Sequence, residues 1–102
     1  MLFESQSPPA GAGGGRVMQD AANLAAAGHR VIVVLVQNGV LGALSGGCAA
    51  ARAAGAVVWA DPVSLAERGM EPAWTEAAGV LTRGLEAAAA WLVRPGVKAV
   101  WH

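Results

Sequence analysis

The residue of this sequence with the clearest potential for covalent chemistry is its single cysteine. Cys48 is the only cysteine among 102 residues, and it follows Ser45-Gly46-Gly47 at the predicted start of a helical segment. Backbone N–H groups and the positive end of a helix dipole favour a thiolate there, and Arg52 is spaced to share a helix face with it. Cys48 is therefore a candidate sulfur nucleophile. The alternative is a small apolar residue packed among alanines, because free cysteine is among the most often buried residue types.

Polar residues follow three predicted strands and form a second candidate site. The carboxyl ends of parallel strands meet at one edge of a sheet, and ligands of open α/β sheets bind beyond that edge. We therefore expect a ligand-binding cleft there. The candidate ligand-binding residues are Ser5, Asn38, Gly39, Asp61, Ser64 and Arg68.

Four of these residues also have a purely structural interpretation. Asn38-Gly39 either brings backbone amides close to a ligand or forms a tight turn that needs a positive φ. Ser64 is predicted to cap a short helix, with Glu67 completing a capping box. Arg68 either binds an anion or bridges subunits through a bidentate contact.

Other kinds of site are not indicated. His29 and His102 lack metal-ligand spacing with Cys48, so we expect no metal. The glycines at 13–15 do not form a phosphate-binding loop, because Arg16 stands where that motif needs Lys followed by Ser or Thr. Flavin binding would rest on analogy of fold alone, so we expect no cofactor.

The elements that must position these residues alternate between strand and helix. The runs 31–36 and 56–60 are continuous and largely apolar, which is typical of strands buried on both faces of a parallel sheet. Helices are expected over 16–27, 40–54, 64–68 and 81–93, and further strands at Leu2-Phe3 and over 97–101. This alternation predicts a three-layer α/β/α domain with four or five parallel strands, flavodoxin-like and with the first strand central. Residues 1–102 form one domain, with a mobile loop at 8–15.

Composition points to self-association. Hydrophobic types make up 55% of the chain and charged types 14%, against a usual charged share of about 25%. So few charges on so small a body predict a homo-oligomer. Four tryptophans suit interfaces better than nucleotide stacking, because no basic residues are expected beside them. These are Trp59, Trp74, Trp91 and Trp101.

Charge and hydropathy also limit the partners. The formal net charge is zero, with no cluster of cations to bind nucleic acid or an anionic membrane. The apolar run 31–36 is far shorter than the roughly 20 residues that span a bilayer. The opening Met-Leu-Phe-Glu-Ser lacks the pattern of a secretory signal. We expect a cytoplasmic protein.

Several segments, in order, resemble the DsrE/DsrF-like family, which includes the TusD-type sulfur-relay subunits. They are Leu-Phe-Glu-Ser-Gln-Ser-Pro at the start, Leu-Ala-Ala-Ala-Gly-His-Arg-Val before residue 32, Val-Gln-Asn-Gly-Val-Leu-Gly-Ala over 36–43, Ser-Leu-Ala-Glu-Arg-Gly over 64–69 and Lys-Ala-Val-Trp-His at the end. The similarity runs nearly end to end. It implies a compact α/β domain, assembly into trimers or hexamers, and handling of sulfane sulfur.

In active members of that family a persulfide cysteine lies near the end of the third strand, upstream of the Arg-Gly motif. The corresponding stretch here, 57–61, has no cysteine. Two hypotheses follow. The chain is a sulfur-relay protein, with Cys48 as an unusual carrier (a possible sulfurtransferase) or with the cysteine of a relay partner. Alternatively, it is a non-catalytic oligomeric subunit that binds a small ligand or a partner protein.

Overall fold

The structure is a computed structural model that describes residues 1–8 and 15–102. Five parallel strands form one sheet in the order β4-β3-β2-β1-β5. They are β1 (Leu2–Glu4), β2 (Ile32–Leu35), β3 (Val57–Ala60), β4 (Leu81–Thr82) and β5 (Val100–Trp101). The predicted parallel α/β sheet is confirmed, but its middle strand is β2, and β1 lies beside it. The predicted loop at 8–15 falls mainly on 9–14, outside the described residues.

The two predicted central strands lie side by side. Each residue of β2 is paired in parallel with one of β3, from Ile32 with Val57 to Leu35 with Ala60. Branched side chains are stiff at χ1 and fit a pleated surface. Val33 and Val34 are both fully buried although they point to opposite faces, as expected of a strand covered on both sides.

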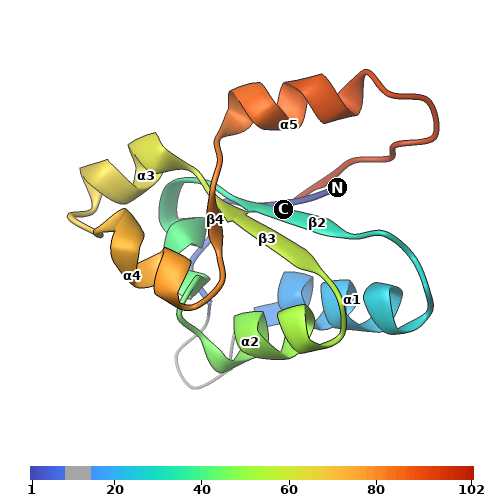
Figure 1. The fold of residues 1–102 in the computed structure, drawn as a ribbon, viewed down its shortest axis with the longest axis horizontal. Helices are drawn as coiled ribbons and strands as arrows, with labels where there is room; N and C mark the ends of the chain where they lie inside the picture. Colours follow the sequence, from blue (N-terminus) through green and yellow to red (C-terminus); the bar gives the residue numbers. More distant parts are fainter. Residues whose placement is uncertain (9–14) are drawn as a thin grey trace.

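Helices cover both faces of the sheet (Figure 1). α1 (Gly15–Ala26) and α2 (Gly46–Ala53) lie on one face, and α5 (Leu85–Leu92) lies on the other. The 3₁₀ helix η1 (Gln37–Gly42) and the short helices α3 (Pro62–Glu67) and α4 (Pro72–Ala77) stand beyond the carboxyl ends of the inner strands. The three-layer architecture is therefore present, with the polar candidate residues at the end carrying η1 and α3.

The C-terminal half differs from the sequence prediction in two places. Leu81 was expected to begin a helix, but it pairs with Trp59 in β4, and the ladder continues through Arg83, whose N–H donates to the carbonyl of Ala60 (3.1 Å). α5 begins only after Gly84. Helix α4 was not predicted, because its six residues are too few to show a periodic pattern. Strand β4 and helix α4 are therefore present in addition to the elements that the sequence predicted.

The two faces of the sheet are covered unequally. The face under α1 and α2 carries the larger buried cluster, which includes Val33, Leu35 and Val58. The α5 face carries a smaller one around Phe3 and Trp59. In the described part of the chain α5 alone covers this face (Figure 1). Apolar side chains near its margins consequently stay open to solvent.

Candidate functional site

All six predicted ligand-binding residues lie at the carboxyl edge of the sheet. Ser5 follows β1, Asn38 and Gly39 lie in η1 after β2, and the remaining three lie in or beside α3 after β3. The parallel topology brings these loops together although they are up to 63 positions apart in the chain (5 to 68). The structure therefore assembles a polar edge, which we define as these six residues with Gln37 and Glu4.

A hydrogen-bond network joins the ends of β2 and β3. The Asp61 carboxylate accepts from the backbone N–H of Ser64 (2.9 Å) and from its hydroxyl (2.8 Å). The same hydroxyl oxygen accepts from the backbone N–H of Gln37 (2.8 Å). Asp61 and Ser64 are both buried. The Ser64 hydroxyl thus both donates and accepts a hydrogen bond. These bonds hold η1 against α3.

The cap of α3 is Asp61, so the predicted capping box of Ser64 and Glu67 is wrong. The helix begins two residues earlier than expected, with Pro62 at its first position. Proline suits that position because its missing N–H would have no partner there. Ser64 is consequently inside the first turn, where its hydroxyl bonds back to the capping carboxylate.

Arg68 is held within the chain. Its Nε donates to the side-chain oxygen of Asn38 (3.0 Å), and its Nη1 donates to the carbonyl of Ser64 (3.1 Å). A guanidinium carries five N–H donors, so these two bonds orient the fork while other donors remain available at the polar edge. Arg68 and the exposed Asn38 are the members of the edge best placed to meet a polar ligand.

Gly39 is needed for close approach and not for a positive φ. The left-handed position of this turn is taken by Gln37, with φ 50°. A Cβ at Gly39 would overlap the carbonyl oxygen of Glu4 and lie 2.8 Å from its carbonyl carbon. Gly39 does lie in a turn, as predicted, but a positive φ is not the reason for glycine there. The reason is that the backbone of η1 packs directly on the end of β1.

Sequence reasoning missed Glu4 and His102 as neighbours. Glu4 is buried, with 8% of the residue exposed. It accepts from the N–H of Gln6 (2.9 Å) and lies 3.0 Å from Nδ1 of His102. Ser5 donates its hydroxyl to the carbonyl of His102 (2.9 Å). Only the pairing of β1 with β5 brings these residues together, and no local pattern in the sequence specifies which strand pairs with which.

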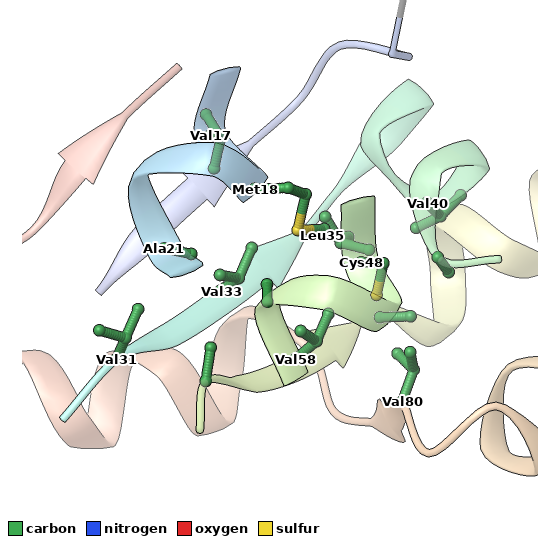
Figure 2. Packing of buried hydrophobic residues seen from close by; sticks show 14 of the residues in the cluster. Val17, Met18, Ala21, Val31, Val33, Leu35, Val40, Cys48, Val58 and Val80 are labelled. Atoms are coloured by element: carbon green, nitrogen blue, oxygen red, sulfur yellow. The ribbon is translucent and has the colours of Figure 1, made fainter. Parts of the chain in front are cut away.

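Cys48 is sealed inside the protein. Ser45 caps α2 by accepting from the N–H of Cys48 (3.1 Å), so the predicted position in a first helical turn is confirmed. The side chain, however, is 1% exposed and belongs to the cluster with Val58 and Val80 (Figure 2). Burial raises the pKa of the thiol, and Arg52 only partly opposes this effect. The helix-start position therefore does not produce a reactive thiolate here.

Arg52, which the sequence placed on the helix face of Cys48, makes a structural contact. Its guanidinium donates to the carbonyl of Ala78 (2.5 Å), at the end of α4. It links α2 to the segment before β4. The Arg52 side chain is therefore fixed by a contact between two segments of the chain and is not free to activate the Cys48 thiol.

The tryptophans contradict one expectation. Basic residues were expected to be missing beside them, but Arg83 stands over Trp59, and Arg30 and Arg94 stand over Trp91. Trp59 is also buried within the chain. Trp74 and Trp101 remain largely exposed. The four residues therefore do not share one role.

No group of three or more potential metal ligands is present among residues 1–8 and 15–102. In the same residues, no helix combines the length and the apolar character needed to cross a membrane. Comparison with known proteins found no match to a protein-family model, to a curated protein or to a solved structure. The resemblance to the DsrE/DsrF-like family therefore stays a prediction.

Proposed function

We propose that this chain is a non-catalytic DsrE/DsrF-like subunit, associated with sulfur relay or sulfur metabolism, that works by binding a partner or small ligand in an oligomer. The observation that carries the proposal is the burial of its only thiol. A sulfur carrier must present a nucleophilic thiolate to donor and acceptor. A thiol that is 1% exposed, with a raised pKa, presents none.

The polar edge supports a binding role. Its buried members Asp61 and Ser64 are paired with each other and with backbone. They fix the loops, while Arg68 and Asn38 keep polar groups toward solvent. Rigid elements that hold a few outward polar groups are a common way to build a binding site. This edge is the surface we assign to a polar ligand or to a partner of the relay.

An apolar surface supports assembly into a homo-oligomer, a trimer or a hexamer. On the β5 side of α5 the chain leaves a hollow of about 340 Å³ whose lining is mostly apolar and includes Phe3 and Trp101. Three large apolar side chains that line it are between 41% and 58% exposed. They are Leu85, Leu92 and Trp101. We call this set the α5–β5 surface, and a contiguous surface of this kind marks an association site.

Incubation with a small-molecule persulfide donor tests the proposal against the carrier hypothesis. We expect intact-mass spectrometry of the native protein to show no added sulfur atom, because the donor cannot reach the Cys48 thiol. The same donor added in urea should modify Cys48, which shows that the reagent is competent. A Cys48→Ala variant, unmodified in both conditions, identifies the site. Rapid addition of sulfur to the native chain would contradict the non-catalytic assignment.

A further inference from the structure

The β4 side of α5 has a second hollow with a different lining. It measures about 250 Å³ and lies over the sheet between α5 and strands β2, β3 and β4. Its floor is apolar and open, since Val57 is 43% exposed and Leu81 is 44% exposed. Its remaining lining residues include Ile32, Trp59, Trp91, Arg30 and Arg83. An uncovered apolar floor at this position would accept a flat apolar group.

Arginines stand over the tryptophans of this hollow. The Cζ of Arg83 lies 5.5 Å from the ring centroid of Trp59. Trp91 is approached by Arg30 at 5.4 Å and by Arg94 at 4.1 Å. A guanidinium over an aromatic face is held by cation–π attraction. Its N–H donors remain free in the plane of the group for a carboxylate or a phosphate.

Among the described residues these three arginines have no anionic partner. In the described residues no carboxylate lies within salt-bridge distance of Arg30, Arg83 or Arg94, the one such contact there being that of His102 with Glu4. Two of the seven Lys and Arg residues, Arg30 and Arg83, thus line one hollow of a chain with zero net charge, and Arg94 stands over one of its tryptophans. Uncompensated positive charge beside open apolar surface is complementary to an anion with an apolar body.

We propose that this hollow binds a small organic anion that consists of one flat ring and one phosphate or carboxylate group. The ring would lie against Val57 and Leu81, and the anionic group would lie between Arg30 and Arg83. A polyanion such as a nucleic acid fits less well, because it needs a longer cationic track than one hollow provides.

This site is separate from the polar edge. Apart from Arg83, the hollow is lined from the amino-terminal and middle parts of the strands and from α5. It shares no residue with the polar edge or with the α5–β5 surface. Failure of the anion proposal would therefore leave the proposed function standing, and the reverse also holds.

The test uses phenyl phosphate as the probe, followed by the indole N–H resonances of the four tryptophans in two-dimensional NMR. We expect saturable shifts of the Trp59 and Trp91 signals, while the signals of Trp74 and Trp101 stay in place. Phenol, which lacks the charge, and inorganic phosphate, which lacks the ring, should each bind at least about tenfold more weakly, because each removes one half of the interaction.

The matched variants are Arg83→Gln and Arg16→Gln. Arg16 is an exposed arginine of α1, on the opposite face of the sheet. We expect Arg83→Gln to weaken phenyl phosphate binding about tenfold or more and Arg16→Gln to leave it unchanged. Arg30→Gln should weaken it similarly, and it serves as the second variant if Arg83→Gln disturbs the end of β4.

Three results would overturn the proposal. Equal shifts of all four indole signals would show non-specific binding. Equal affinity for phenol and phenyl phosphate would remove the role of charge. Unchanged affinity in folded Arg83→Gln and Arg30→Gln variants would remove the arginines from the site.

Discussion

Replacement of Gly39 by alanine is expected to lower the free energy of unfolding by about 3 kcal/mol or more. The new Cβ would overlap the Glu4 carbonyl oxygen and lie 2.8 Å from the carbonyl carbon. Both are backbone atoms at the end of an inner strand, so no side-chain rotation relieves the contact. The carbonyl of Glu4 also accepts from the N–H of Val36 (3.0 Å), and displacement of η1 would strain that bond. Urea unfolding followed by tryptophan fluorescence measures the loss.

Gly46→Ala is the matched control for this prediction. Gly46 begins α2, and a Cβ there meets nothing within 4 Å. Alanine is the better helix former, so stability should be unchanged or slightly raised. If Gly39→Ala were as stable as Gly46→Ala, η1 would not pack on β1 as described, and the polar edge would lose its geometry.

Asp61→Ala is expected to cost about 2–4 kcal/mol, the sum of two losses. The first is the cap of α3, since an N-cap carboxylate replaced by alanine typically costs about 1 kcal/mol. The second is the acceptor of the buried Ser64 hydroxyl, and an unpaired buried polar group costs about 1–3 kcal/mol. Thermal and urea unfolding report the sum.

Asp20→Ala is the control for Asp61→Ala. Asp20 is an exposed aspartate of α1, and its removal should change stability by no more than about 0.5 kcal/mol. The double variant Asp61→Ala/Ser64→Ala should cost less than the two single losses added together, because the hydroxyl left unpaired by the first change is absent. Strict additivity would mean that Asp61 and Ser64 do not interact.

The inner strands could be predicted from sequence because their signal is local. Five of the six residues of the run 31–36 are valine or isoleucine, and such a run has few alternatives to a doubly buried strand. The alternation of elements then specified a parallel sheet and placed all six polar residues at one edge. What the sequence could not supply was the order of the strands, on which the contact of Glu4 with His102 depends.

The candidate site was predicted by position more accurately than by role. Cys48 lies in a first helical turn as expected, but which face of α2 packs on the sheet decides whether its thiol is reactive, and that is a tertiary property. Gly39 was assigned to a turn, while the constraint on it comes from Glu4, 35 positions earlier (39 minus 4). Arg94 is close to Trp91 in the sequence, but Arg30 is far from Trp91 and Arg83 is far from Trp59, so no short sequence window contains the whole cluster.

The central claim is that this chain acts through association, and light scattering tests it most directly. At micromolar concentration we expect the mass of a trimer or a hexamer. Leu85→Glu should reduce that mass toward one chain, because Leu85 lines the α5–β5 surface and is 49% exposed. Val63→Glu is the control, since Val63 is 64% exposed on α3, away from that surface, and it should leave the mass unchanged. A mass of one chain for the unsubstituted protein at every concentration would contradict the account.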